Sequence, residues 1–206
     1  MIRGLDRGQR AALLISECQR GVIEPAHSLY PGLVEQVQSR GIVPRIASLA
    51  EVFRAAGLPV VHLHVAHRPD FADLPRTSII ISRSVKTGAM AIGSVDVEAV
   101  PELAPHPVDV VDARRYSLVA FHGTGLDQTL RNLGVQTVVL AGVSTNVAIS
   151  GAALCASDLG YQVVVAEDCI AGATAESHAF IIANLLPLYS TLSDAQSVGQ
   201  AITASG

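Results

Sequence analysis

The chain has 206 residues, of which half are hydrophobic and 16% are charged, and its formal net charge is −4. A chain of this length can bury a sizeable core, and its composition is typical of a folded protein rather than a disordered one. The slightly negative charge and the scarcity of aromatic residues argue against a nucleic-acid partner, because such partners select basic faces and stacking platforms.

Cysteine content and apolar segments indicate where the protein works. The three cysteines, Cys18, Cys155 and Cys169, have no metal-type spacing, and an odd number does not suggest a disulfide framework. The charged N-terminal segment lacks the apolar core of a signal peptide, and the apolar run at residues 11–16 is too short to span a bilayer. We therefore expect a cytoplasmic protein with no membrane partner.

The first half of the chain alternates apolar runs with one helical segment. Strands are predicted at residues 11–16, 59–65 and 108–113. Between the first two, residues 33–57 contain apolar residues at helical spacing and end at a glycine, which is a typical helix stop. Pro44 argues against a single unbroken helix over this whole segment.

The second half continues the alternation of helices and strands. The pattern predicts a short helix ending at Gly134, a strand at 136–141, a helix at about 145–159, a strand at 161–167, a helix at 175–186, a short strand near 189–193 and a C-terminal helix from Asp194. Continuous apolar strands between helices favour a parallel sheet covered on both faces. We predict one domain over residues 1–206, a doubly wound three-layer αβα sandwich with a mostly parallel six-stranded sheet.

Residues 66–107 form the least regular part of the sequence. Turn-forming residues recur through this segment, which follows the carboxyl end of a predicted strand. A long insert at that place can act as a lid or a substrate-binding loop. A surface excursion without a role is the other interpretation, and the sequence favours neither.

Ligands of an open parallel sheet bind beyond the carboxyl ends of the strands. Glu17 follows the first strand, where partial burial suits a carboxyl group to general acid or base work, although a solvated glutamate has the same pattern. Arg114 and Arg115 follow the third strand and are candidates for binding an anionic group. The alternative is a surface pair of basic residues.

The turn GVST, residues 142–145, joins the fourth strand to a helix. The first N–H groups of a helix have no partner within it and can bind an anion. Ser144 or Thr145 can cap this helix, and an ordinary cap would have a similar geometry. The turn alone is therefore a weak indication of an anion or oxyanion site.

The remaining reactive side chains give weaker indications. Cys155 and Cys169 have apolar neighbours typical of buried thiols, and Cys18 should face away from Glu17 because adjacent strand residues point to opposite faces. The histidines His62, His64 and His67 raise the idea of a metal, but the sequence dictates no suitable third ligand. We expect no metal and no cofactor.

Three blocks of the sequence together resemble the isochorismatase-like superfamily, also called cysteine hydrolases. They are AALLISECQRGV, then RRYSLVAFHGTGLDQTLRNLGV, and then LAGVSTNVAISGAALCASDLGYQVVVAEDCIAG, in the order typical of the family. The resemblance covers nearly the whole chain apart from residues 66–107. It implies the αβα fold, a small-molecule substrate, a homodimer or higher homo-oligomer, and a cis peptide bond between Val143 and Ser144.

The resemblance also identifies departures from the family triad of Asp, Lys and Cys. Glu17 stands at the Asp position, Arg114 or Arg115 near the Lys position, and Ala148 at the Cys position. An alanine cannot attack a carbonyl, so thioester-forming amide hydrolysis is not expected. The matched motifs further imply a substrate pocket around six residues: Gln19, Phe121, Val143, Ser144, Thr145 and Asn146.

Three functional hypotheses follow from this resemblance. The family contains isochorismatases with a small residue at the Cys position, which implies a hydrolase that uses Glu17 as general acid or base on a small anionic metabolite without a covalent thioester. The alternative is a catalytically inactive member that binds a metabolite or a protein through the inherited pocket. A weaker third hypothesis is a hydrolase that uses Cys18 or Cys155 instead.

Overall fold

The central strand of the sheet is β1 (Ala11–Ser16), all of whose residues are buried. The computed structural model describes residues 2–6 and 8–205, and its six strands pair in the order β3-β2-β1-β4-β5-β6, all parallel. The other strands are β2 (Val60–Val65), β3 (Val110–Arg114), β4 (Thr137–Val143), β5 (Gln162–Ala171) and β6 (Thr191–Ser193). The predicted α/β fold with a six-stranded sheet is confirmed.

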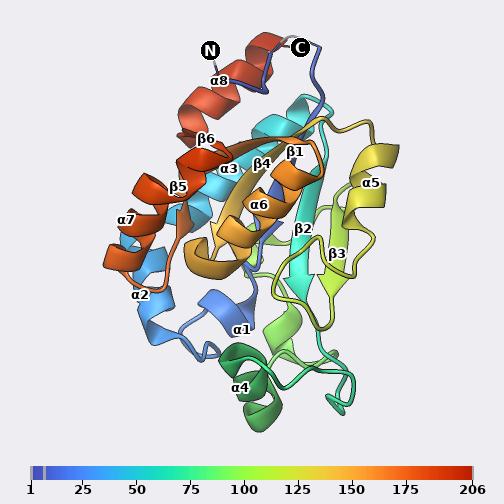
Figure 1. Ribbon diagram of the computed structural model, residues 1–206, viewed down its shortest axis with the longest axis vertical. Coiled ribbons are helices and arrows are strands. Elements are labelled where there is room, and N and C mark those ends of the chain that lie inside the picture. The colour runs from blue at the N-terminus through green and yellow to red at the C-terminus, as the bar shows by residue number, and fades with distance from the viewer. Residues whose placement is uncertain (1, 7, 206) are drawn as a thin grey trace.

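Helices cover both faces of this sheet (Figure 1). On one face α2 (Pro31–Arg40), α3 (Ile42–Ala55) and α8 (Ala195–Ser205) share one core cluster with alternate residues of β1, such as Leu13. On the other face α5 (Leu126–Asn132), α6 (Ser150–Asp158) and α7 (Ala175–Asn184) pack with Leu14 and its neighbours. Both faces of the four inner strands are buried, which explains their largely apolar sequences. None of the described helices is long and apolar enough to cross a membrane.

Residues 33–57 contribute to two helices, so the prediction that they do not form a single unbroken helix is confirmed. The break lies at Gly41, which has a left-handed backbone with φ of 58° between α2 and α3. Pro44 lies in the first turn of α3, where the N–H that proline lacks would have no helical partner. Glycine therefore ends the first helix, and proline is accommodated at the start of the second.

Strand β5 ends four residues later than the prediction, which ended it at Glu167. The register with β4 shifts between Leu140 and Gly142, so Glu167 and Asp168 lie at an irregularity within the strand rather than at its end. Arg40 stabilises this irregularity, because its guanidinium donates hydrogen bonds to the carbonyl oxygens of Glu167 (2.9 Å) and Ile170 (3.0 Å). Asp168 and Cys169 consequently do not lie at the carboxyl edge of the sheet.

The insert at residues 66–107 is more ordered than its sequence indicated. It contains the helix α4 (Ile79–Thr87) and two 3-10 turns, η1 (Val95–Val97) and η2 (Pro101–Leu103). Ser78 caps α4 by accepting a hydrogen bond from the backbone N–H of Ile81. Figure 1 shows α4 and the short helix α1 (Arg20–Ile23) beyond the end of the sheet to which the arrowheads of β2 and β3 point.

Gly142, near the end of β4, is required by the close approach of β1. Its φ is +101°, and a Cβ there would lie 2.2 Å from the carbonyl oxygen of Ser16. We predict that Gly142→Ala lowers the free energy of unfolding by more than about 3 kcal/mol, because the clash is with backbone that cannot move. Equilibrium urea denaturation measures this change.

Gly160→Ala is the matched control for this substitution. Gly160 also has a positive φ, +86°, but a Cβ there would meet no atom within 4 Å. Gly160→Ala should lower the free energy of unfolding only by the backbone strain, about 1–2 kcal/mol. Equal losses in the two variants would contradict the steric explanation for Gly142.

Candidate active site

A cavity of about 370 Å³ opens at the carboxyl edge of the sheet. Its wall is mostly apolar, with contributions from α1, α2, α4 and the segment after β4. The polar side chains on the wall come from five separate parts of the chain: Glu17, Tyr30, His67, Ser84, Arg114, Ser117, Ser144 and Asn146. An apolar pocket with a few converging polar groups is the usual form of a small-molecule site.

Glu17 reaches this cavity because the backbone turns sharply after β1. Its φ is 51°, a left-handed conformation that is uncommon for a residue other than glycine. Its N–H still donates to the carbonyl oxygen of Leu63 (2.9 Å), so the turn begins while the residue is attached to β2. The side chain is 17% exposed and lies on the cavity wall. Such strained residues cluster at functional sites.

Arg114, the last residue of β3, faces Glu17 across the cavity. Its Nη2 donates to Oε1 of Glu17, and its Nε donates to the carbonyl oxygen of Ser117 (2.8 Å). The side chain is only 3% exposed. Its Nη1 is buried and has no hydrogen-bond partner among the described residues. A buried guanidinium with a spare donor is suited to bind a carboxylate or another anion.

The segment after β4 forms another wall of the cavity. The peptide bond between Val143 and Ser144 is cis, as the sequence resemblance implied. Residues Thr145–Ile149 then form a π-helical turn, in which the N–H of Ile149 donates to the carbonyl oxygen of Ser144 (3.0 Å). Ser144, Asn146 and Ala148 line the cavity. Turns of this kind are rare and frequently occur at functional sites.

Two side-chain contacts hold this π-helical turn in place. Thr145 Oγ1 lies 2.8 Å from Nδ1 of His178 on α7, and both residues are buried. Asn146 Oδ1 accepts a hydrogen bond from the backbone N–H of Ala173 (2.7 Å). The turn is therefore fixed to α7 and to the loop that precedes it, independently of any side chain at position 148.

The structure does not bring every predicted site residue to the cavity. Arg115 is exposed and contributes its carbonyl oxygen to a hydrogen bond with Nδ1 of His67, so Arg114 is the arginine on the wall. Val143 and Thr145 are buried behind the wall. Backbone direction changes after a strand ends, so strand alternation could not decide between the two arginines.

Gln19 and Phe121 also lie outside the cavity wall. The side chain of Gln19 is fully buried and joins the end of β2 to the insert: its Nε2 donates to the carbonyl oxygens of Val65 and Val97 (both 2.9 Å). Phe121 packs against Tyr161, with ring centroids 6.1 Å apart, in the core under α5 and α6. These two residues position the surroundings of the cavity rather than facing a ligand.

His67 is the wall residue whose role the sequence pattern did not reveal. The sequence presented it only as a possible metal ligand, together with His62 and His64. Instead, His62 lies 3.2 Å from the Asp109 carboxylate, and burial lowers the pKa of His64 to about 4. No three His, Cys, Asp or Glu side chains within residues 2–6 and 8–205 are grouped as a metal site.

The thiols lie away from the cavity wall. Cys18 and Cys169 are buried in the core, and Cys155 is half-buried on α6. Burial, and then the neighbouring Glu17 charge, raise the pKa of Cys18 to about 12. Burial also raises the pKa of Cys155. A protonated thiol is a poor nucleophile, so nothing in their placement favours a role in catalysis.

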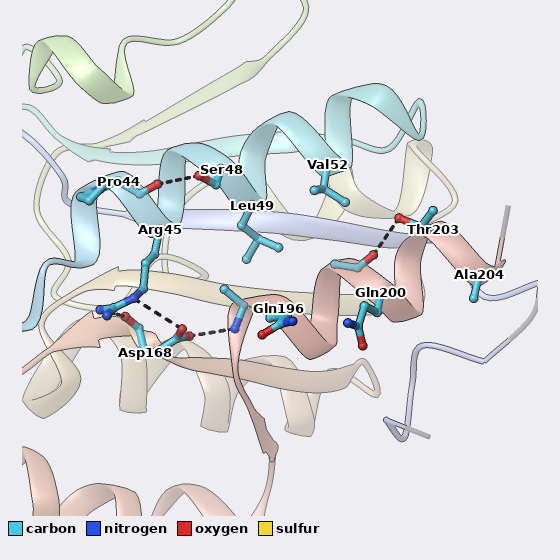
Figure 2. Close-up of a pocket in the computed structure, with 12 residues that line it drawn as sticks. Pro44, Arg45, Ser48, Leu49, Val52, Asp168, Gln196, Gln200, Thr203 and Ala204 are labelled. Atoms are coloured by element: carbon cyan, nitrogen blue, oxygen red, sulfur yellow. Dashed lines mark hydrogen bonds and ion pairs between the residues drawn. The ribbon is translucent and has the colours of Figure 1, made fainter.

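A larger groove of about 880 Å³ lies between α3 and α8 on one face of the molecule (Figure 2). Its charged side chains are Arg45 and Asp168, whose Nε and Oδ2 atoms lie 3.8 Å apart. Asp168 also accepts a hydrogen bond from the N–H of Ala195 (2.8 Å). Arg45 and Asp168 are thus paired with each other, and Asp168 also holds the first residue of α8. Because the charged groups of this groove have structural roles, we place the candidate active site in the smaller cavity.

The family model for the isochorismatase domain matches residues 11–197. The chain belongs to the isochorismatase family. It is 30% identical to a maleamate amidohydrolase of Pseudomonas putida over 91% of this chain and 83% of that protein. It is also 30% identical to a protein of Arabidopsis thaliana described as a probable inactive nicotinamidase, over 89% and 90% of the two chains.

The fold agrees with solved structures of this family. An isochorismatase family protein from Desulfovibrio vulgaris subsp. vulgaris str. Hildenborough matches with a TM-score of 0.83 and 27% identity, over 95% of this chain and 100% of that chain. Membership of the isochorismatase family thus agrees with the three sequence blocks from which it was predicted.

The burial of His178, which contacts the π-helical turn through Thr145, makes the stability of the protein depend on pH. Burial, and then the charge of Arg40, lower the pKa of His178 from about 6.5 to about 4. Between these values the unfolded chain binds a proton that the folded protein does not, so stability is lost as the pH falls through this window. We predict that His178→Gln reduces the loss of unfolding free energy between pH 7 and pH 5 by about 2 kcal/mol.

Urea denaturation of both proteins at the two pH values tests this prediction. His64 stays in both proteins, so its own lowered pKa contributes equally and cancels in the comparison. An equal loss of stability in the wild type and in His178→Gln would show that His178 is not the responsible group.

Proposed function

We propose that this protein is an isochorismatase-family hydrolase that acts on a small carboxylate without forming a covalent thioester. In this proposal Glu17 is the general acid and base, and Arg114 binds the anionic group of the substrate. Ala148 occupies the position of the family nucleophile and leaves room beside the substrate. The placement of Glu17, Arg114 and Ala148 around one cavity supports this assignment.

The observation that carries the proposal is the guanidinium of Arg114 on the cavity wall. Its Nε and Nη2 are bonded within the protein while Nη1 has no partner among the described residues, so an anionic group in the cavity would gain a charge-assisted interaction with Arg114. Maleamate, the substrate in the name of one relative, combines a carboxylate with an amide. A small carboxylate with a hydrolysable group nearby therefore suits both the cavity and the family.

The proposed reaction needs one group that both gives and takes a proton. A carboxyl group at Glu17 gives a proton to the substrate, at the vinyl carbon of an enol ether or at the leaving group of an amide. Water adds to the activated carbon, and the Glu17 carboxylate takes the proton that the water loses. The C–N bond of an amide then breaks and releases ammonia, whereas the C–O bond of the hemiketal formed from an enol ether breaks and releases a ketone and an alcohol. The residue is unchanged after one cycle, and no bond to the enzyme is formed.

The alternative is a pseudoenzyme that binds a metabolite in the same cavity. The relative described as probably inactive makes this a realistic second function. The contact between Glu17 and Arg114 also supports it, because an ion pair satisfies both groups without any chemistry. Tight binding of a small carboxylate without product formation would favour this alternative.

We predict that Glu17→Gln lowers kcat/KM at least about a hundredfold on any substrate that the wild type hydrolyses, because the amide cannot exchange a proton in this way. The assay is product formation from maleamate, from isochorismate as the enol ether, and from a panel of small amides. Glu35→Gln is the control, since Glu35 is exposed on α2 and away from the cavity wall. Unchanged turnover in Glu17→Gln would exclude Glu17 as the acid and base.

We further predict that Ala148→Cys creates a reactive thiol. A side chain at this position faces the cavity and Arg114, whereas burial keeps the pKa of Cys155 raised. Iodoacetamide should modify position 148 about tenfold faster than Cys155, as measured by peptide mass spectrometry. Excess maleamate should slow the modification, and a rate no faster than that of Cys155 would contradict the assignment of Ala148.

A further inference from the structure

His67 lies on the cavity wall directly after β2 and is only 4% exposed. Its backbone is held on both sides by the insert, because its N–H donates to the carbonyl oxygen of Met90 and its own carbonyl accepts from Ile92 (both 2.8 Å). The backbone N–H of the preceding residue, Ala66, donates to the carbonyl oxygen of Arg114 (3.0 Å). The imidazole is therefore fixed beside the proposed anion site.

The hydrogen-bond partner of His67 determines its tautomer. Nδ1 contacts the backbone carbonyl oxygen of Arg115, which can only accept, so Nδ1 must carry the hydrogen. In the neutral ring Nε2 then has a lone pair and acts as an acceptor. Burial lowers the pKa of His67; the Arg115 carbonyl opposes this shift, Arg114 adds to it, and Asp73 also opposes it. The neutral form is thus the one present at pH 7.

Three other polar side chains on the wall are occupied within the protein. Asn146 Oδ1 accepts from Ala173, and the hydroxyl groups of Ser84 and Ser117 donate to backbone carbonyl oxygens. Nε2 of His67, by contrast, makes no hydrogen bond to any described residue. The His67 side chain is nine-tenths buried, and its Nε2 keeps accessible surface on the cavity wall, so a substrate that fills the cavity buries this acceptor and must supply a donor for it.

We propose that Nε2 of His67 accepts a hydrogen bond from an N–H or O–H group of the substrate while Arg114 binds its carboxylate. His67 is then a specificity-determining residue, which selects amide acids or hydroxy acids over carboxylates of the same shape that lack the donor. A substrate without the donor leaves the buried acceptor unpaired and is rejected. The inference rests on the anion site proposed for Arg114.

A matched pair of small acids tests this selection. Succinamate and levulinate have the same shape and carboxylate, but an amide NH₂ in the first replaces a methyl group in the second. Glutaramate and 5-oxohexanoate form the same comparison with a longer chain. We expect the wild type to bind the amide acid of at least one pair about tenfold more tightly, as measured by calorimetry or by NMR titration.

His67→Asn separates binding from structure. The side-chain amide introduced by this substitution can still donate to the Arg115 carbonyl oxygen but has no acceptor at the place of Nε2. The affinity for the amide acid divided by the affinity for the matching keto acid should therefore fall to about one. The levulinate affinity should stay unchanged. His122→Asn is the control, since His122 is exposed and away from the cavity wall, and it should keep the wild-type preference. An unchanged preference in His67→Asn overturns the inference.

Long-range ¹H–¹⁵N spectra of the imidazole nitrogens give a second readout that needs no turnover. They should show the Nδ1–H tautomer of His67 at pH 7 and a shift of Nε2 when succinamate is added; an Nε2–H tautomer overturns the inference. If the wild type binds both members of each pair with equal affinity, the proposed role of His67 is refuted but the anion site at Arg114 is not. If none of the four acids binds, the anion site at Arg114 is refuted as well.

Discussion

The contact between Glu17 and Arg114 is the interaction on which the rest of the site depends. It joins the carboxyl ends of β1 and β3, which are separated in the sheet by β2. A buried ion pair gains little stability by itself, yet removing one partner leaves an uncompensated charge and costs about 3–5 kcal/mol. The parallel order of the three strands brings both groups to one edge, and the left-handed backbone at Glu17 turns its carboxylate toward the arginine.

The wall that contains Ala148 is held by contacts that do not involve this residue. Thr145 is bound to His178, and Asn146 is bound to the backbone of Ala173. The side chain at position 148 therefore lines the cavity without being needed for the shape of the turn. This separation gives a physical reason why a family that shares one fold can contain members with different mechanisms and members without activity.

The fold could be predicted from the sequence because the four inner strands are largely apolar runs, buried on both faces, that alternate with helices. Glu17 and Arg114 were predicted to lie at the carboxyl edge by the same rule. The strand-end rule could not exclude Arg115, because side-chain direction after a strand depends on how the backbone turns. Nor could it find the roles of Gln19 or His67, since their hydrogen-bond partners lie tens of residues away in the chain.

Residues 66–107 supply part of the cavity wall, together with α1, α2 and the segment after β4. Ile80, Ile81 and Ser84 of α4 line it, and Arg83 of the same helix lies over the ring of Tyr30, 5.7 Å from its centroid. Helix α4 is thereby attached to the segment that precedes α2. Groups suited to chemistry thus stand at strand ends fixed by the core, whereas much of the apolar surface that would contact a substrate belongs to the insert. Changes in α4 can therefore alter which molecule fits while the pair of Glu17 and Arg114 stays in place.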